Sequence, residues 1–478
     1  MSRVMSRREF VATSAAGAAT ALLPQAWGAT GRLRAGAAKA DITAKVGVSL
    51  TGTILQIGPA RAIHDKLHAR CLVLDDGATR VAIVVADVTM VSGEVLEKAK
   101  RLAHERTGIP VNRMMFSATH THAAPRMIGI GTAPVDKEYY EHFCRQIAEA
   151  MAQAVKNLAP ASVAWGAADV PRFTRNRRWF MKPGSLGPNP FGDTTDQVMM
   201  HGRPAKNRVR PSGPVDPEFS FLFVRHADGR PLAALGNYSI HYVGGYGRAT
   251  VSADYFGLFG PELAKLLGVD KREAAAFVGL MSNGTSGDIG GPGGSYGGMQ
   301  RLAHTLASRV AKAWPTLTWH DHVPLVMIER VVHLGVRLPN AERIAWANET
   351  LKRKLRKGEH RWTRIYAHET LKLAEYPVKA PVKLQALRVG GLGIAAIPNE
   401  VYAITGLAIK RESALKATFT IGLANAYYGY LPTPEQHKLG GYTTWPCRSS
   451  CLEVQAEPKI RAAVVNLLKQ VAEQGQSD

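Results

Sequence analysis

The stretch Met114-Met115-Phe116-Ser117-Ala118-Thr119-His120-Thr121-His122 joins an apolar run directly to two histidines. A short apolar run of this kind predicts a buried strand, and residues i and i+2 of a strand point to the same side. His120 and His122 are therefore expected to project together from the end of a strand. Neutral imidazole is a common zinc ligand, so the pair predicts a metal site. A structural histidine pair is the alternative.

Further runs around this stretch predict alternating strands and helices. Strands are expected over residues 80–87 and 113–119, and helices over 92–106 and 138–158. Residues 383–389 and 392–397, separated by two glycines, predict a hairpin. This alternation is typical of an α/β fold with mixed β-sheets flanked by helices. Residues 181–216 are expected to form a long loop and residues 284–298 a glycine-rich one.

Composition narrows the functional classes. The chain has 478 residues, of which 46% are hydrophobic and 21% charged, which predicts a large core and argues against a disordered chain. No apolar run is long enough for a membrane span in the mature protein. The formal charge of +22 favours anionic surfaces or polymers, but without an RRM-like, zinc-finger or helix-turn-helix pattern no nucleic acid is expected as a partner. The basic stretch 351–364 predicts a solvated helix face or a peripheral contact with an anionic membrane or polymer.

The N-terminus predicts export. Residues 6–11 contain paired arginines, Arg7 and Arg8, and a weakly apolar run follows to Leu23. This pattern is typical of a twin-arginine signal peptide over residues 1–28, and it predicts a periplasmic or secreted protein. In an oxidising compartment Cys447 and Cys451 are candidates for a disulfide. The other two cysteines, Cys71 and Cys144, lie in apolar patterns typical of buried thiols.

Other candidate site residues lie far from the first pair in the sequence. His241 follows an apolar strand pattern, and Glu400 follows the predicted hairpin. A carboxylate in such a position needs a metal or an arginine as partner, because burying it alone is costly. Tyr430 and Tyr442 flank a loop that is rich in proline and glycine. The chain lacks the aspartate and histidine that metallo-β-lactamases carry after H-x-H, and it has no H-E-x-x-H helix.

The order of these short motifs carries more information than any one of them. The set comprises Asp41-Ile42-Thr43, Ser117 to His122, Asn176-Arg177, the strand before His241, Gly287-Asp288, Ile397-Pro398-Asn399-Glu400, and Asn425 through Tyr430 to Tyr442. Together they resemble the catalytic domain of the neutral/alkaline non-lysosomal ceramidase family, from about residue 33 to the C-terminus.

The resemblance implies a zinc site with His120, His241, Glu400 and Tyr430 as ligands. It also implies that His122 and Arg177 face the substrate head group, with Tyr442 beside them. Two imidazoles, one carboxylate and one phenol oxygen leave Zn²⁺ an open position for water or substrate. Asp288 is a lower-ranked candidate that orients the glycine-rich loop or a water molecule.

Two departures from the family pattern bear on the chemistry. Gly290 occupies the position at which the family carries its nucleophilic serine, and Thr285 and Ser286 lie nearby but out of register. The chain also ends too early for the C-terminal immunoglobulin-like domain of the larger members. Because glycine has no hydroxyl, we expect zinc-activated water to attack, with a shifted hydroxyl as the alternative.

The sequence therefore predicts an exported zinc hydrolase that cleaves an acyl bond, with the amide of an N-acyl lipid or related molecule as leading substrate class. One alternative keeps the zinc site but changes the substrate to an ester, a lactone or a carbohydrate-derived molecule. Another is a non-catalytic envelope protein that binds anionic polymer. The oligomeric state is left open.

Overall fold

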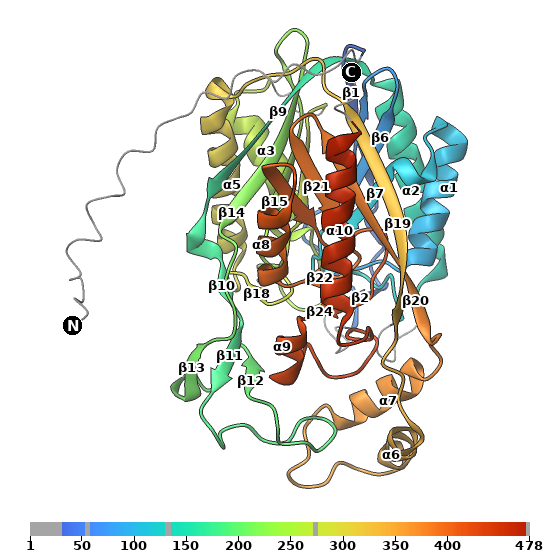
Figure 1. Ribbon diagram of the computed structural model, residues 1–478, viewed down its shortest axis with the longest axis vertical. Coiled ribbons are helices and arrows are strands. Elements are labelled where there is room, and N and C mark those ends of the chain that lie inside the picture. The colour runs from blue at the N-terminus through green and yellow to red at the C-terminus, as the bar shows by residue number, and fades with distance from the viewer. Residues whose placement is uncertain (1–30, 53–57, 130–134, 271–275, 475–478) are drawn as a thin grey trace, which may run out of the picture.

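The computed structural model describes residues 31–52, 58–129, 135–270 and 276–474 (Figure 1). The expected signal peptide, residues 1–28, lies outside these ranges. Among the helices of the described residues, none combines the length and apolar character needed to cross a membrane.

An eight-stranded mixed sheet occupies the centre of the molecule, in the order β17-β15-β14-β9-β1-β5-β6-β7. In chain order the strands are β1 (Arg34–Asp41), β5 (His68–Asp75), β6 (Arg80–Ala86), β7 (Met114–Ala118), β9 (Ala159–Asp169), β14 (Glu218–His226), β15 (Pro231–Tyr238) and β17 (Val278–Asn283). The pairs β6–β7 and β15–β17 are parallel, and the other neighbours are antiparallel. The predicted strands over 80–87 and 113–119 are confirmed as β6 and β7.

A second sheet has four strands in the order β19-β20-β21-β23. The strands are β19 (Leu325–Gly335), β20 (Lys379–Val389), β21 (Leu392–Ala396) and β23 (Ala417–Ile421). The predicted hairpin is confirmed as β20 and β21, joined at Gly390, whose φ of 59° is left-handed and therefore favours glycine.

The two sheets pack face to face, and helices cover their outer faces. Alternation along β5 shows the principle: Leu72 and Leu74 point into the core between the sheets, whereas Cys71 and Val73 pack toward the helices. The large sheet is covered by α1 (Gly93–Thr107), α2 (Lys137–Lys156), α3 (Asp254–Leu266) and α5 (Tyr296–Ala313). The small sheet is covered by α8 (Ala403–Glu412) and α10 (Ala456–Glu473), which face the viewer in Figure 1. This layering confirms the predicted α/β class with mixed sheets.

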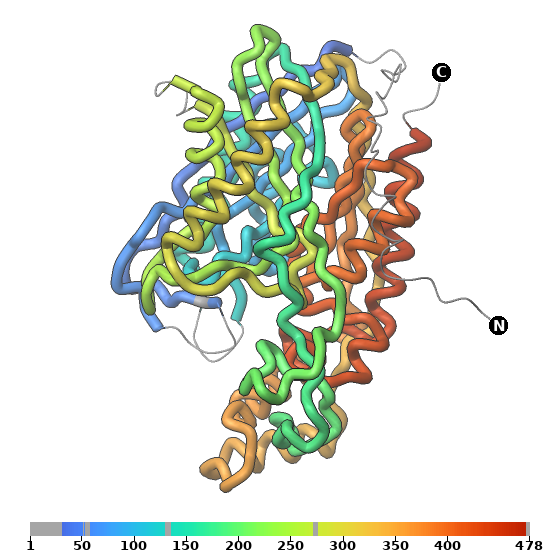
Figure 2. Tube along the Cα trace, turned by 90° about the vertical axis from the view of Figure 1, so that its left-hand side faces the viewer, coloured from blue at the N-terminus to red at the C-terminus, as the bar shows by residue number. Residues whose placement is uncertain are grey.

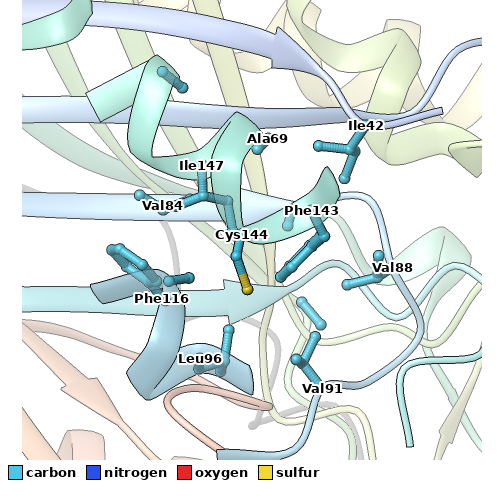
Figure 3. Close-up of a cluster of buried hydrophobic side chains, with 14 of the residues drawn as sticks. Ile42, Ala69, Val84, Val88, Val91, Leu96, Phe116, Phe143, Cys144 and Ile147 are labelled. Atoms are coloured by element: carbon cyan, nitrogen blue, oxygen red, sulfur yellow. The ribbon is translucent and has the colours of Figure 1, made fainter. Parts of the chain in front are cut away.

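The core under α1 and α2 shows how the helices attach. Phe143 and Ile147 of α2 and Leu96 of α1 meet Val84 and Phe116 of the sheet (Figure 3). Cys144 lies among them as a fully buried free thiol, and Cys71 is buried as well, as predicted. The helices expected over 92–106 and 138–158 are confirmed as α1 and α2.

Cys447 and Cys451, the candidates for a disulfide, are free, buried thiols in the structure. The Cys447 Sγ lies 3.2 Å from the Ser449 Oγ, and the Cys451 thiol donates to the carbonyl of Tyr428 at 3.5 Å. Burial raises the pKa of both thiols, that of Cys447 to about 11 and that of Cys451 to about 12. Each sulfur is therefore held as a thiol with its own oxygen neighbour.

Residues 181–216 are more ordered than the expected long loop. They contribute β12 (Val198–Met200) and β13 (Arg208–Pro211), which flank β11 (Arg178–Met181) in a small sheet. The alternation is too short and the sequence too polar for a pattern to reveal these strands. Figures 1 and 2 show this sheet at the same end of the molecule as α6 (Ala341–Lys352) and α7 (Thr363–Leu373).

The basic stretch 351–364 is mostly a connection rather than the expected helix face. Helix α6 ends at Lys352 and α7 begins at Thr363, and Arg353 binds Glu359 within the turn between them. Part of the charge of this segment is thus neutralised locally.

Candidate metal centre

His120 and His241 lie on the loops that follow β7 and β15. The chain leaves β7 at Ala118, before either histidine. Strand alternation therefore does not orient the imidazoles, contrary to the expectation from the sequence. A turn does so instead: His120 has a φ of 72°, and its N–H donates to the carbonyl of Val88 at 3.0 Å. Left-handed backbone is uncommon outside glycine and often occurs at functional sites.

Three imidazole nitrogens converge. The Nε2 of His120 lies 3.1 Å from the Nε2 of His241 and 3.3 Å from the Nε2 of His122. The Nδ1 of His120 lies 2.7 Å from the carbonyl oxygen of Thr89, and the Nδ1 of His241 lies 3.3 Å from that of Ser286. Since a carbonyl only accepts, these contacts place the proton on Nδ1 and leave the Nε2 lone pairs of His120 and His241 directed at one point.

Glu400 and Tyr430 come from two paired strands, β22 (Glu400–Val401) and β24 (Tyr430–Leu431), in which they are register partners. The Oε2 of Glu400 lies 3.4 Å from the His120 Nε2 and 3.9 Å from the His241 Nε2. The hydroxyl of Tyr427 donates to the other oxygen, Oε1, at 2.9 Å. Glu400 Oε2 is buried and accepts no hydrogen bond.

These donors fit a divalent cation. Two imidazole lone pairs and one buried carboxylate oxygen without a partner face the same space, and nitrogen and oxygen donors of these kinds are the usual zinc ligands. Ligand atoms of His120, His122 and His241 all lie within 4.8 Å of one another. The predicted ligands His120, His241 and Glu400 are thus brought together, and Tyr430 lies on the strand paired with that of Glu400.

Burial and nearby positive charge keep the imidazoles of His122 and His241 neutral. Burial, together with the positive charge of Arg177, holds the pKa of His122 and of His241 well below the usual range. Burial by itself would raise the pKa of Glu400, but the neighbouring His120 and Arg177 outweigh it and lower that pKa. Neutral nitrogens and an ionised carboxylate are the protonation states that a metal ion requires.

Arg177, which the family resemblance leads us to expect near the substrate, lies beside this cluster. Its Nη2 donates to the carbonyl of Gly287 at 2.8 Å and to the Tyr430 hydroxyl at 3.4 Å, and it lies 4.0 Å from Glu400 Oε2. Residue 177 follows β10 (Arg175–Asn176), which pairs with β18 (Ile289–Gly290), so the glycine-rich loop fixes the backbone of Arg177.

A cavity of about 730 Å³ opens in front of the cluster. Seven of the eight predicted site residues line it, namely His120, His122, His241, Glu400, Tyr430, Arg177 and Tyr442. Tyr442 packs edge-on against Tyr430, with the ring centroids 5.8 Å apart. Apolar side chains, among them Met199, Trp362 and Trp445, form much of the remaining wall.

The eighth residue, Asp288, does not line this cavity. Its carboxylate is buried and accepts from Asn176 Nδ2 at 2.7 Å and from the Ala403 N–H at 2.9 Å. It therefore ties the glycine-rich loop to β10 and α8, which matches the loop-orienting part of the expectation.

The hydroxyls of Thr285 and Ser286 do not line the cavity either. Ser286 Oγ donates to Asn283 Oδ1 at 2.6 Å, and Thr285 Oγ1 lies 3.1 Å from Ser239 Oγ, both in buried surroundings. At Gly290, a Cβ atom would lie 3.3 Å from the Cβ of Arg177. The family resemblance places a serine at position 290. In this chain that position faces Arg177 but carries no hydroxyl.

Two residues of the site, Tyr242 and Tyr427, were not predicted from the sequence. Tyr242 stacks on His122, with ring centroids 3.8 Å apart and planes 17° apart, and Tyr427 binds Glu400. Tyr242 adjoins His241, and Tyr427 lies three residues before Tyr430. Proximity in sequence to a predicted ligand was the available signal.

Comparison with known proteins agrees with this geometry. The sequence profile described as "Neutral/alkaline non-lysosomal ceramidase, N-terminal" matches residues 33–292. The chain belongs to the neutral/alkaline non-lysosomal ceramidase family. It is 24% identical to neutral ceramidase B of Dictyostelium discoideum over 217 residues, which is 43% of this chain and only 28% of that protein.

Solved ceramidase structures share the fold. The neutral ceramidase of Pseudomonas aeruginosa matches with a TM-score of 0.67 and 17% identity, over 94% of this chain and 75% of that one. A structure described as a ceramidase complexed with C2 matches with the same TM-score and identity, over 94% of this chain and 76% of that one. The large mixed sheet that carries the histidine loops is therefore an arrangement of this family.

Proposed function

We propose that the protein is an exported, zinc-dependent amidohydrolase that cleaves the amide of an N-acyl lipid or a related molecule. The observation that carries the proposal is the convergence of His120 and His241 on the unpartnered oxygen of Glu400, at the end of a large cavity. Membership of the ceramidase family supports amide hydrolysis, and the twin-arginine pattern of the sequence supports export.

His120, His241, Glu400 and Tyr430 are the residues that would hold the ion. When bound there, zinc supplies Lewis acidity toward the acyl carbonyl and lowers the pKa of water. The nucleophile in this proposal is water, because the hydroxyls of Thr285 and Ser286 point into the protein interior and residue 290 is glycine.

The residues around the ion have separate tasks. The guanidinium of Arg177 is fixed by the carbonyl of Gly287 and is placed to stabilise the negative charge that develops on the acyl oxygen. His122 is neutral and has a buried Nδ1 without a partner, so it is suited to accept a proton and to return it to the leaving amine. Stacking on Tyr242 holds the His122 ring in place.

Zinc content and hydrolysis, measured together, test the proposal. His120→Ala, His241→Ala and Glu400→Ala are each expected to lower bound zinc sharply and to abolish hydrolysis of N-acyl amides, because each removes one ligand. His304→Ala, which changes an exposed histidine paired with Glu262, is the matched control and should keep both. Normal zinc in all three site variants would refute the assignment. A purified zinc enzyme that cleaves esters or lactones but no amide would refute the substrate class.

A further inference from the structure

Two arginines of the cavity carry charge that nothing in the described protein neutralises. Arg203 follows β12, Arg361 precedes α7, and both line the cavity. Neither guanidinium has a hydrogen bond or an ion pair among the described residues. Nearby arginines are paired: Arg353 binds Glu359, and Arg448 binds Glu369.

The acidic residues of the cavity are already engaged elsewhere. Among the described residues that line it, only Glu400 and Asp196 are acidic. Glu400 belongs to the histidine cluster, and Asp196 accepts a hydrogen bond from the Trp445 indole N–H at 2.8 Å. The cavity therefore holds positive charge at Arg203 and Arg361 without a resident counter-charge.

A row of aromatic rings joins the metal end of the cavity to Arg361. The Arg177 guanidinium lies 6.0 Å from the Tyr430 ring centroid, and the centroids of Tyr430 and Tyr442 are 5.8 Å apart. Those of Tyr442 and Trp362 are 5.6 Å apart, and Arg361 lies 5.0 Å above the Trp362 ring. An apolar wall thus separates a cationic group beside the cluster from a cationic group at the far end of the row.

We infer that the substrate is an anionic amphiphile: an N-acyl amide whose carboxylate or phosphate binds Arg203 and Arg361, with an apolar segment between that anion and the amide. The inference rests on the proposed function and names its substrate class. Guanidinium groups form strong, charge-assisted and often bidentate hydrogen bonds with such anions. The aromatic row offers apolar surface to the segment between the two ends.

A pair of substrates that differ only in charge tests the inference. One is an N-acyl amide with a carboxylate at the far end of the acyl chain, and the other is its methyl ester; a second pair carries the carboxylate or its ester on the amine side. The wild type is expected to prefer one carboxylate over its ester in kcat/KM. Arg203→Gln and Arg361→Gln should each reduce kcat/KM about tenfold for that carboxylate, mainly through KM, because each removes a charge-assisted hydrogen bond. Hydrolysis of the ester should stay unchanged.

Arg356→Gln is the matched control, because Arg356 is exposed in the same connection as Arg361 but does not line the cavity. Repeating the assay with a terminal phosphate in place of the carboxylate separates the two anions. Equal cleavage of carboxylate and ester, with no selective effect of the glutamine variants, would overturn the inference and leave the proposed function standing. So would variants that lose only binding to phosphatidylserine vesicles, since the arginines would then serve a membrane contact.

A different set of results would show that the proposed function itself is wrong. If the wild type cleaves no amide, quenching of Trp362 and Trp445 fluorescence by the same compounds measures binding alone. Selective binding of the carboxylate, lost in Arg203→Gln and Arg361→Gln, would still support an anionic ligand. Equal binding of carboxylate and ester would overturn it.

Discussion

Position 290 bears on the chemistry of this site because a glycine there supplies no side-chain hydroxyl. Gly290 pairs with Arg175 across β18 and β10, and a side chain there would start against Arg177. With glycine at this position the guanidinium has no hydroxyl neighbour from the loop. In the proposed function a water nucleophile takes the place of the serine that the family resemblance leads one to expect.

Direct attack by water predicts different effects of alanine substitution at four residues. Thr285→Ala and Ser286→Ala should each retain most of kcat, because their hydroxyls bind buried partners away from the cavity. His122→Ala and Arg177→Ala should each lower kcat roughly 10²-fold or more, the usual cost of removing an acid–base or oxyanion group, while zinc stays bound. Steady-state kinetics and elemental analysis of the four variants provide the measurements.

Mass spectrometry of enzyme quenched during turnover gives the independent check. No acyl adduct is expected on Thr285 or Ser286. A covalent adduct on either residue, together with loss of activity in the matching alanine variant, would show that an acyl-enzyme route operates instead.

At the scale of elements, the site depends on the close approach of the glycine-rich loop to β22. The N–H of Gly287 donates to the carbonyl of Val401 at 2.8 Å, and a Cβ at position 287 would lie 2.3 Å from the carbonyl oxygen of Glu400. Such an overlap with backbone cannot be relieved by rotating a side chain. The strand that presents Glu400 therefore requires glycine opposite it.

We expect Gly287→Ala to push β22 away from the histidines, lowering zinc content and destabilising the protein by about 1–3 kcal/mol, as overpacking typically does. Gly294→Ala, in the same loop, is the control, because a Cβ there meets nothing within 4 Å. Urea unfolding and zinc analysis compare the two variants. Equal stability and equal zinc would mean that the loop and β22 move independently.

At the scale of the whole molecule, a buried polar network ties the layers together. Lys100 of α1 is fully buried and donates to Asn425 Oδ1 at 2.8 Å. Asn425 in turn donates to Gln385 of β20 at 2.8 Å, so the network runs from the helices over the large sheet to the small sheet. Burial, reinforced by the charge of Lys383, lowers the pKa of Lys100 from 10.5 to about 8.

This shift predicts the sign of a pH effect on stability. Between pH 8 and pH 10.5 the unfolded chain holds a proton on Lys100 that the folded protein has released, so the free energy of unfolding gains a rising contribution, of order 3 kcal/mol over the whole window. Lys100→Met lacks this contribution. The difference in unfolding free energy between wild type and variant, measured in urea at pH 7.5 and near pH 10, should therefore shift in favour of the wild type. A difference that stays constant with pH would show that Lys100 titrates normally.

Export is a second prediction for the whole chain. Arg7→Lys combined with Arg8→Lys should leave precursor in the cytoplasm, because the twin-arginine route reads that pair. Arg3→Lys, outside the pair, should not. Cell fractionation distinguishes the two, and normal export of the double variant would refute the assigned route.

Local sequence was sufficient for several elements and for naming candidate donors. The apolar runs placed β6, β7, α1, α2 and the β20–β21 hairpin, because side-chain periodicity depends only on neighbours in the chain. The motifs Ser117 to His122 and Ile397 to Glu400, taken in order, indicated the ceramidase family, which the family match confirms.

Tertiary structure alone decided what those donors face. The left-handed turn at His120 depends on a backbone conformation that residue type does not specify. The pairing of Glu400 with Tyr430 joins residues 30 apart in sequence, and the stacking of Tyr242 on His122 joins residues 120 apart. Cys447 and Cys451 are close in sequence, yet each is a free thiol with its own oxygen neighbour. The sequence did not single out Arg203 and Arg361. Only the structure shows that both line one cavity and that neither has a counter-charge among the described residues, because such surroundings are three-dimensional.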